Sequence, residues 1–480
     1  MTVPYDREGL TAGIVHVGVG GFHRAHQAMV IDRLLEQGLA RDWAICGVGI
    51  LPADERIRDV MRAQDGIYTL VTRNPDGTAD ARRIGSIIEH LHAPDDPEAV
   101  VERMAAPQTR IVSLTITEGG YALDAVTGQF APEDARLLDE ARLRGRDAPR
   151  SVFGFVTEAL TRRRARGVPP FTVMSCDNIQ GNGDAARRAF AGFAAIADPD
   201  FGDWIDREVA FPNAMVDRIT PRTTPEDVAA VAAEFGGADA WPVVAEPFFQ
   251  WVLEDHFPAG RPPFDAAGVH LVADVEPYEL MKLRLLNASH QALCYFGRLL
   301  GHTYVHEAAH DPRIVALLTA YMADEGAPTL QPVPGIDLAT YQRTLIERFA
   351  NAHVRDTIAR LCADSSDRIP KWLLPVVRDQ LAAGGPVRLA AAIVASWARY
   401  AEGVDETGAA IDVVDRAREQ VMAAAARQRA EPLAFLRQPD LFGDLVDNER
   451  FIREYSWALD ALHRQGAAAT LDALNRGNTY

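Results

Sequence analysis

The sequence has few cysteines, and they follow no pattern that indicates a cross-link or a metal site. Cys46, Cys176, Cys294 and Cys362 are widely separated among 480 residues, and no two of them form a CxxC pair. Neither a disulfide framework nor a zinc site built from thiolates is indicated. A reducing cytoplasm is therefore the expected compartment.

Targeting and membrane signals are also lacking. Residues 1–8 have neither the basic start nor the apolar run of a secretory signal, and no uncharged apolar segment is long enough to span a bilayer. We therefore expect a soluble and unprocessed protein.

Positive charge is in deficit, with 49 Lys and Arg residues against 67 Asp and Glu residues and a formal net charge of -18. Such a surface repels nucleic-acid backbones and anionic membranes, so neither is an expected partner. The basic run at residues 162–166 is interpreted as the solvated face of a helix. Hydrophobic content of 48% with 24% charged residues is typical of a globular enzyme with two or three domains.

A glycine-rich turn follows the first predicted strand, residues 13–17, and precedes a helical pattern at residues 28–35. The turn reads Gly18-Val19-Gly20-Gly21-Phe22-His23. Strand, glycine turn and helix form the usual binding arrangement for a dinucleotide pyrophosphate. His23 stands where the general fingerprint has its third glycine, so a simple tight turn is the alternative interpretation.

The second predicted strand, residues 43–48, leads to Asp54 and a helix through Arg62. A carboxylate at this position can accept hydrogen bonds from the adenosine ribose and repel a 2′-phosphate, which favours NAD over NADP. Asp54 could instead complement the dipole of the helix that it precedes, and both roles could coexist.

Further strands are predicted at residues 68–71, 111–116 and 171–175, with helical segments between several of them. This pattern predicts an α/β N-terminal half with a mainly parallel sheet. Two polar loops follow the strands, at residues 115–121 and 175–178. Because ligands gather where parallel strands end, both loops are candidates for binding, and ordinary capped turns are the alternative.

The rest of the chain changes from strands to helices. Proline-interrupted segments at residues 211–219 and 241–247 indicate edge strands or extended connectors, and residues 269–272 indicate a strand. Helical periodicity then continues at residues 317–322, 341–349, 388–400, 413–425 and 451–462. We therefore predict a Rossmann-type dinucleotide-binding domain at residues 1–275 and a largely all-helical substrate-binding domain at residues 276–480.

One helix stands out between these two parts, at residues 279–291. At about 100° per residue, Glu279, Lys282, Asn287 and His290 fall within an arc of roughly 140° on an otherwise apolar helix. Lys282 and His290 lie about 12 Å apart along such a helix, enough to line one small-molecule pocket. A lysine with a histidine suits acid–base chemistry, although a solvated helix face is the alternative.

A second motif belongs to a different class of protein. His306-Glu307-Ala308-Ala309-His310 matches the HExxH pattern of zinc metallopeptidases. Asp311-Pro312 follows at once, so the helix is expected to end where a zinc-binding helix would continue. We therefore treat a zinc peptidase as the less favoured hypothesis.

These motifs occur in one order: the glycine turn, Thr117-Glu118-Gly119-Gly120-Tyr121, Ser175-Cys176-Asp177-Asn178, residues 213–218 and the Lys282, Asn287 and His290 spacing. In this order the chain resembles the polyol-specific long-chain dehydrogenases and reductases over nearly its whole length. The resemblance implies a Rossmann-type domain, a largely helical domain, a site in the cleft between them, and hydride transfer without a metal.

The resemblance also implies catalytic roles. Lys282 would be the general base, and Asn287 and Asn178 would donate hydrogen bonds to the oxygen as it becomes alkoxide-like. His290 would orient the substrate, and Glu279 would pass the released proton towards solvent. A lysine base must be neutral, which requires desolvation or nearby positive charge to lower its pKa.

Substrate and coenzyme residues follow from the same resemblance. Asp217, Arg360 and Arg368 match positions near the substrate hydroxyls, but a lysine is expected where Arg368 stands, so Lys371 is the alternative cation. The implied coenzyme contacts are Gly18, Gly20, Gly21, Phe22 and Arg24 in a turn that lacks the third glycine in this family too, with Asp54, Thr117 and Glu118.

The implied reaction is NAD-dependent oxidation of D-mannitol to D-fructose and its reverse, with NADP less favoured and no metal. D-arabinitol 4-dehydrogenase and fructuronate or tagaturonate reductase are alternatives within the family. A uronate would need an extra cation, for which Arg360, Arg368 and Lys371 are available. The family and the negative charge both favour a monomer.

Overall fold

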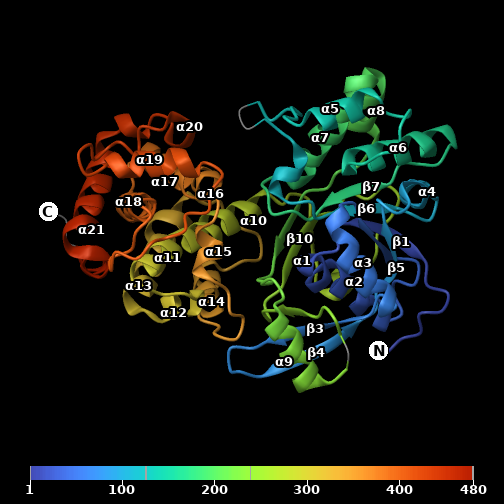
Figure 1. Cartoon of the computed structure of the whole chain (residues 1–480), viewed down its shortest axis with the longest axis horizontal. Coiled ribbons are helices and arrows are strands. Elements are labelled where there is room, and N and C mark those ends of the chain that lie inside the picture. Colours follow the sequence, from blue (N-terminus) through green and yellow to red (C-terminus); the bar gives the residue numbers. More distant parts are fainter. Residues whose placement is uncertain (1, 125–126, 238, 478–480) are drawn as a thin grey trace. The chain divides into compact units, whose positions relative to one another are not determined.

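The computed structural model describes residues 2–124, 127–237 and 239–477. The chain forms two compact units, Met1–Glu276 and Pro277–Tyr480, each with its own interior (Figure 1). The first unit contains the strands of the named sheets, and the second is built from helices.

A five-stranded parallel sheet organises the N-terminal unit. Its strand order is β5-β2-β1-β6-β7, and every neighbouring pair is parallel. The strands are β1 (Ala12–Val17), β2 (Ala44–Gly49), β5 (Ile87–His92), β6 (Ile111–Leu114) and β7 (Thr172–Ser175). The chain therefore leaves β1 in one direction through β2 and β5 and returns to its other side with β6 and β7, which is the Rossmann arrangement.

Both faces of this sheet are buried, because alternate side chains enter two separate cores. Val15 and Val17 pack with helices on one face, while Ile14 packs with the opposite core. The helices of this unit are α1 (Gly21–Ala25), α2 (Gln27–Glu36), α3 (Glu55–Ala63), α4 (Pro97–Ala105), α5 (Ala135–Arg142), α6 (Val152–Ala165), α7 (Asn182–Ala197), α8 (Pro199–Glu208) and α9 (Pro225–Phe235), with short turns η1 (Pro52–Asp54), η2 (Glu118–Tyr121) and η3 (Phe264–Ala267).

Two smaller sheets complete the unit. One has the order β4-β3-β9 and the other β11-β10-β8. Their strands are β3 (Tyr68–Arg73), β4 (Ala79–Ile84), β8 (Ala214–Asp217), β9 (Val243–Ala245), β10 (Gln250–Glu254) and β11 (His270–Val272). The proline-containing segments form β8 and β9, both edge strands as predicted.

The third parallel strand differs from the prediction. The strand expected at residues 68–71 forms β3 in a separate sheet, and β5, which was not predicted, pairs with β2 instead. Residues 87–92 alternate poorly because Glu89 and His90 lie within the strand and are half-buried. A buried parallel strand usually has a continuous apolar run, and this one does not.

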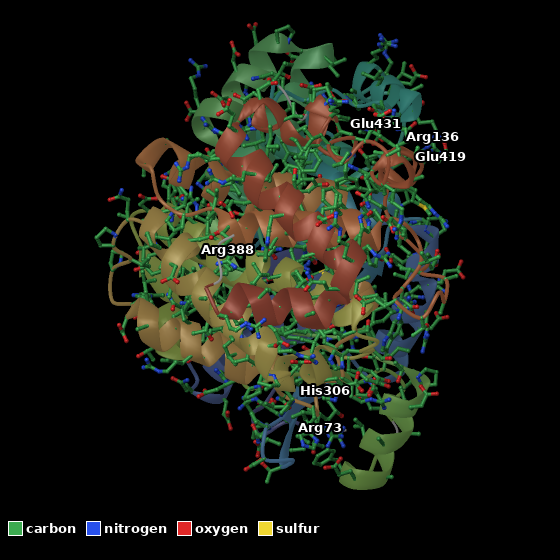
Figure 2. All side chains as sticks on the ribbon, turned by 90° about the vertical axis from the view of Figure 1, so that its left-hand side faces the viewer. Arg73, Arg136, His306, Arg388, Glu419 and Glu431 are labelled. Carbon is green, nitrogen blue, oxygen red and sulfur yellow. The ribbon has the colours of Figure 1, made fainter. Side chains whose placement is uncertain are left out.

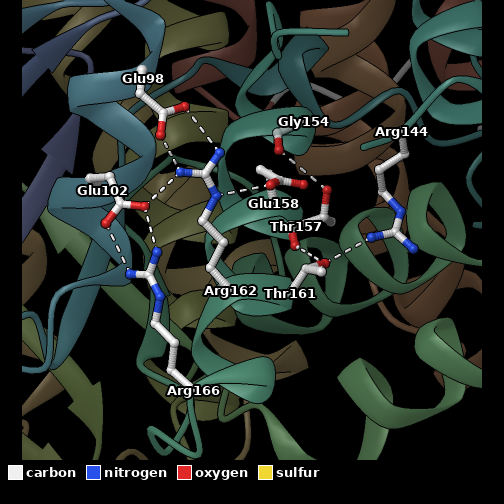
Figure 3. A network of polar contacts seen from close by, with 9 residues as sticks. All are labelled: Glu98, Glu102, Arg144, Gly154, Thr157, Glu158, Thr161, Arg162 and Arg166. Carbon is white, nitrogen blue, oxygen red and sulfur yellow. Dashed lines mark hydrogen bonds and ion pairs between the residues drawn. The ribbon is translucent and has the colours of Figure 1, made fainter. Parts of the chain in front are cut away.

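The basic run at residues 162–166 is only partly a solvated face. Arg162 binds Glu98, Glu102 and Glu158, and Arg166 also binds Glu102, which joins α6 to α4 (Figure 3). Arg163 is buried instead and donates hydrogen bonds to the carbonyl oxygens of Pro169, Ala106 and Thr109. The prediction was wrong for Arg163 because a buried arginine can satisfy several loop carbonyls at once.

The regular structure of the C-terminal unit is helical in the described residues, apart from two isolated β-bridges. It contains α10 (Glu276–Met281), α11 (Ala288–Leu299), α12 (Val305–His310), α13 (Pro312–Ala320), α14 (Leu338–Phe349), α15 (Ile358–Cys362), α16 (Ser365–Trp372), α17 (Leu374–Ala383), α18 (Arg388–Tyr400), α19 (Arg418–Arg427), α20 (Pro439–Phe442) and α21 (Glu449–Asn475), with short turns η6 (Ala327–Thr329) and η7 (Leu445–Asp447). The helix predicted at residues 413–425 begins only at Arg418.

Two helices contain π-helical turns, η4 (Lys282–Asn287) and η5 (Tyr321–Gly326). The first interrupts the helix that was predicted to be uniformly α-helical. The angular spacing of 100° per residue is therefore wrong across Lys282–Asn287, since a π turn is wider than an α turn. Such turns occur frequently at functional sites.

The structure bears on two further predictions, those on membrane spans and on cysteines. Among the described residues, the helices are too short or too polar to cross a membrane. The four cysteines are all described, and each is a buried free thiol.

A buried carboxylate makes the stability of the C-terminal unit sensitive to pH. Glu325 is 1% exposed, and its two oxygens accept hydrogen bonds from Leu389 N at 2.7 Å and Ala390 N at 2.8 Å, which caps α18. Burial raises the pKa of Glu325 to about 7, although the two hydrogen bonds lower it. The Glu325 carboxyl group therefore holds its proton more tightly in the folded unit than in the unfolded chain.

We expect this carboxyl to stabilise the fold fully below its unfolded pKa and to lose that stabilisation as the pH rises through about 7. The loss is at most about 3 kcal/mol, the equivalent of roughly 2.5 pKa units. Urea unfolding of the wild type and Glu325→Gln at pH 5 and pH 8 would measure it. The variant should be less stable at pH 5 but should vary less with pH; equal pH dependence in both proteins would contradict the assignment.

Candidate active site

The sheet has one point where its strand order reverses, between β1 and β6. In open α/β sheets, ligands bind outside the carboxyl ends of the strands at such a point. Here the end of β1 carries the Gly18 turn, and the end of β6 carries residues 115–121. The structure thus brings together the two N-terminal segments that the sequence singled out for coenzyme binding.

The glycines of the turn serve two different purposes. Gly18 has a φ of +97°, and a Cβ atom there would lie 2.2 Å from the carbonyl oxygen of Thr115, so no side chain fits. At Gly20 and Gly21 a Cβ would meet nothing closer than 3.9 Å and 3.8 Å. The backbone at those two positions is open, as a pyrophosphate would require.

His23, at the position of the missing third glycine, points inward. Its ring stacks on that of His16, with 3.4 Å between the ring centroids. His16 in turn contacts Ser113 Oγ at 2.8 Å and Thr115 Oγ1 at 3.0 Å. Burial lowers the pKa of His16 to about 3, so its ring is neutral and holds the ends of β1 and β6 together by hydrogen bonds.

Three other predicted coenzyme residues, Phe22, Arg24 and Asp54, make contacts within the protein. Arg24 is buried and donates hydrogen bonds to the carbonyl oxygens of Gly20 and Trp241. Phe22 is half-buried, with its ring 4.8 Å from that of His26. Asp54 accepts a hydrogen bond from Leu51 N at 2.9 Å, which caps the short turn η1, and it makes no side-chain cap bond to α3. Its role towards the ribose stays a prediction.

The loop after β6 is held by a residue of the candidate loop at residues 175–178 for which the sequence predicted no role of its own. Asp177, at the end of β7, accepts hydrogen bonds from Ile116 N, Thr117 N and Tyr121 Oη. Thr117 is exposed on this loop. The backbone of Glu118 lies in η2, but its side chain is outside the described structure. Asn178 follows Asp177 and is exposed.

The candidate catalytic residues of the C-terminal unit lie around the π turn η4. Glu279 is in α10, Lys282 and Asn287 are the first and last residues of η4, and His290 is in α11. All four side chains are buried, each less than a tenth exposed. Asp217 and Asn178 belong to the N-terminal unit, so the predicted site residues come from both units.

Two buried atoms of this group have no hydrogen-bond partner within the described structure: Asn287 Nδ2 and His290 Nε2. Buried polar atoms are rarely left unpaired in folded proteins, and exceptions often mark places where a ligand binds. Burial and the charges of Arg360, Arg348, Arg368 and Lys282 lower the pKa of His290 well below its usual value. The imidazole is therefore neutral near pH 7 and can both donate and accept a hydrogen bond.

The candidate substrate cations differ in their surroundings. Arg360 is half-exposed and forms two hydrogen bonds with Asp356, at 2.6 and 2.5 Å. Arg368 donates to the carbonyl oxygens of Arg360 and Leu361, and its charge acts on His290. Lys371 is exposed and paired with Asp367 at 2.8 Å. Arg368 therefore suits the predicted role better than Lys371.

Arg348 was missed, although it is buried in α14 and its charge acts on His290. The next residue, Phe349, places its ring 4.6 Å from that of His290. Nothing in the local sequence distinguishes Arg348 from a solvated arginine. A usable signal was also missed for Lys282: it and Lys371 are the only lysines among 49 basic residues.

The HExxH segment does not have the geometry of a zinc-binding helix. Helix α12 ends at His310, as predicted from Asp311-Pro312. The Glu307 carboxylate accepts hydrogen bonds from Thr303 N and Tyr304 N at 2.7 and 2.9 Å, and His310 Nδ1 contacts the carbonyl oxygen of His306. Figure 2 shows His306 on this unit. Among the described residues, no three His, Cys, Asp or Glu side chains could hold a metal ion together.

Family models match both units of the chain. The model of the mannitol dehydrogenase Rossmann domain matches residues 12–266, and that of the mannitol dehydrogenase C-terminal domain matches residues 274–463. The chain belongs to the mannitol dehydrogenase family. This confirms the resemblance to polyol-specific long-chain dehydrogenases and the fold class that it implied.

Individual relatives agree with the family models. The mannitol 2-dehydrogenase of Phaeosphaeria nodorum is 47% identical over 476 residues, which cover 98% of this chain and 83% of the relative. The structure of Pseudomonas fluorescens mannitol 2-dehydrogenase in a ternary complex with NAD and D-mannitol is similar, with a TM-score of 0.91, 42% identity and coverage of 99% and 96%. A substrate-free D-sorbitol dehydrogenase has a TM-score of 0.89, 37% identity and coverage of 98% and 96%.

The open backbone at Gly20 generates a test of coenzyme binding. We expect Gly20→Ala to weaken NADH binding, because the new methyl group would occupy space that no protein atom fills. The free energy of unfolding should change by about 1 kcal/mol or less. Fluorescence titration with NADH and urea unfolding measure the two quantities. Unchanged NADH affinity in the folded variant would contradict a pyrophosphate site at this turn.

Proposed function

We propose that this protein catalyses the reversible oxidation of D-mannitol to D-fructose with NAD. The observation that carries the proposal is the pair of unpartnered buried atoms on Asn287 and His290, close in sequence to the buried Lys282. A polyol has a hydroxyl group on every carbon and can supply partners for both atoms. The NAD and D-mannitol complex of the Pseudomonas fluorescens relative supports this substrate and coenzyme.

Bound NAD would accept hydride from the carbinol carbon, and the protein must remove the hydroxyl proton. Lys282 is the proposed general base, with its neutral Nζ accepting that proton. Burial disfavours the charged form of an amine, so the buried position of Lys282 favours a neutral Nζ. An arginine could not replace it, because a guanidinium group keeps its proton in proteins.

The neighbouring residues would stabilise and orient the reacting oxygen. Asn287 Nδ2 is a donor without a partner and would bind the oxygen as its negative charge develops. Neutral His290 would hold an adjacent hydroxyl group. Glu279, buried three residues before Lys282, is the proposed route for the released proton. The roles of Asn178 and Asp217 stay predictions from the family resemblance.

Two of the three cations considered for a uronate carboxylate already have carboxylate partners. Arg360 is already balanced by two hydrogen bonds with Asp356, so it is not available as an additional carboxylate ligand without disrupting that pair. Lys371 is likewise paired with Asp367. Fructuronate and tagaturonate reduction are therefore less favoured. Cytoplasmic location and a monomeric state stay predictions; the four free thiols suit a reducing compartment.

Initial rates with a panel of substrates test the proposed reaction. With NAD, we expect D-mannitol to give the highest kcat/KM, ahead of D-arabinitol and sorbitol, and NADP to be less effective. In the reverse direction, D-fructose should be reduced faster than fructuronate or tagaturonate. A preference for a uronate would show that the assigned substrate class is wrong.

The scarcity of lysine allows a direct measurement of the proposed base. Protein labelled selectively at its lysines should give two side-chain NMR titrations, with exposed Lys371 as the internal reference. We expect Lys282 to titrate well below the ordinary lysine pKa of about 10.4, and kcat/KM for mannitol to rise with pH along the same curve.

The variant Lys282→Ala lacks one of the two NMR signals, which identifies that signal as Lys282. The same variant tests whether Lys282 is the general base. Turnover should fall about 10²- to 10⁴-fold, while NADH binding remains nearly intact. Full activity in this variant near neutral pH would remove Lys282 from the mechanism.

A further inference from the structure

The carboxylate of Asp177 ties together the loops that follow β6 and β7. The side chain is buried, and Oδ1 lies 2.8 Å from Thr117 N, while Oδ2 lies 3.1 Å from Ile116 N and 2.7 Å from Tyr121 Oη. Tyr121 Oη also lies 2.6 Å from Ser175 Oγ. One carboxylate therefore accepts three hydrogen bonds from a single loop, and Tyr121 links that loop back to the end of β7.

The loop held in this way contains a disfavoured backbone conformation. Thr117 has a φ of +69° and a ψ of 163°, a region that glycine occupies easily and a residue with a Cβ does not. Asp177 accepts hydrogen bonds from the N–H groups of Ile116 and Thr117, which both precede the Cα atom of Thr117. The carbonyl oxygen of Thr117 accepts a hydrogen bond from Gly120 N at 3.0 Å. Together these hydrogen bonds stabilise the positive φ of Thr117, which a threonine would not adopt without them.

The same loop borders the glycine turn. Its first residue, Thr115, places its carbonyl oxygen so close to Gly18 that no Cβ fits there, and Thr115 Oγ1 donates to Gly18 O at 2.6 Å. Thr117, two residues further on, is exposed. A change in the Thr117 backbone would therefore alter a loop whose first residue packs directly against Gly18.

We propose that Asp177 is a positioning residue of the coenzyme site, which holds Thr117 in its left-handed conformation and so fixes the loop facing the glycine turn. The inference rests on the proposed function, in which this turn and Thr117 contact NAD. Asp177 is buried and acts through the loop. Backbone strain at a binding site is retained where it pre-organises the site for its ligand.

The substitution Asp177→Asn tests the hydrogen bonds with little change in volume. The amide keeps one acceptor oxygen but replaces the other by an NH₂ group, which cannot accept from a backbone N–H. We expect NADH binding, measured by fluorescence titration, to weaken about tenfold, and KM for NAD to rise by more than kcat at saturating NAD falls. A structural defect alone would reduce the active fraction and kcat without this split.

Thr117→Gly makes the test specific to the backbone conformation. Glycine adopts φ +69° without strain, so Asp177 no longer has a strained conformation to offset at this position. In a double-mutant cycle we expect Asp177→Asn to weaken NADH binding strongly when Thr117 is present and only slightly when it is combined with Thr117→Gly. An equal loss in both backgrounds would overturn the proposal.

A matched control is available in the same unit. Asp32 is also buried and accepts hydrogen bonds from a tyrosine hydroxyl, Tyr5 Oη, and from the backbone N–H of Gly85. Its third donor is the guanidinium group of Arg82, so this control also breaks an ion pair. Asp32→Asn should lower the unfolding temperature without weakening NADH binding of the folded protein. A loss of NADH affinity as large as that of Asp177→Asn would mean that any buried defect suffices, and would also overturn the proposal.

A milder variant keeps the test decisive if Asp177→Asn does not fold. Tyr121→Phe removes one of the three hydrogen bonds, and we expect it to weaken NADH binding about threefold. Unchanged NADH affinity in Tyr121→Phe would then overturn the proposal. If the wild-type protein neither binds NADH nor oxidises mannitol, the proposed function is wrong. If the wild-type protein does both, the variants test only the positioning role of Asp177.

Discussion

Buried polar groups need partners, and this constraint shapes both groups of site residues. In the N-terminal unit, His16, Ser113 and Thr115 satisfy one another beneath the glycine turn, and Asp177 satisfies the N–H groups of the neighbouring loop. In the C-terminal unit, Asn287 and His290 each retain a buried atom without a partner among the described residues. Under the proposed function, the first arrangement would form the rim of the coenzyme site, and the second would leave hydrogen bonds for the substrate to complete.

The choice between lysine and arginine follows from the same chemistry. This chain uses arginine almost everywhere, including Arg368, where the family resemblance leads one to expect lysine. A charged contact to a hydroxyl group can be made by either side chain, so an arginine at this position would keep the predicted interaction. Lys282 differs because the proposed reaction requires an amine that can lose its proton, and arginine cannot meet that requirement.

The backbone departs from regular geometry at three places among the predicted site residues. Gly18 allows β1 and β6 to approach closely, Thr117 is held in a left-handed conformation, and η4 widens the helix at Lys282. Each is a departure from regular structure next to a proposed ligand contact. Such departures are retained where neighbouring packing or hydrogen bonds stabilise them.

The sequence by itself determined the features that depend on neighbouring residues. Strand, glycine turn and helix at residues 13–35 are encoded locally, and so are the edge strands with proline and the end of α12 before Pro312. Lys282, Asn287 and His290 were selected from their spacing and the family resemblance, and the structure finds them buried on one helix. Their catalytic roles stay proposals.

Tertiary structure alone decided the features that depend on distant residues. It placed β5 rather than β3 in the parallel sheet, buried Arg163, turned His23 inward and brought the charge of Arg348 to bear on His290. It also gave Asp177 its three hydrogen-bond donors, from residues about 60 positions earlier in the chain. The spacing of apolar residues in the sequence predicts which side chains are buried. A hydrogen-bond partner or a neighbouring charge is determined only when distant segments pack together.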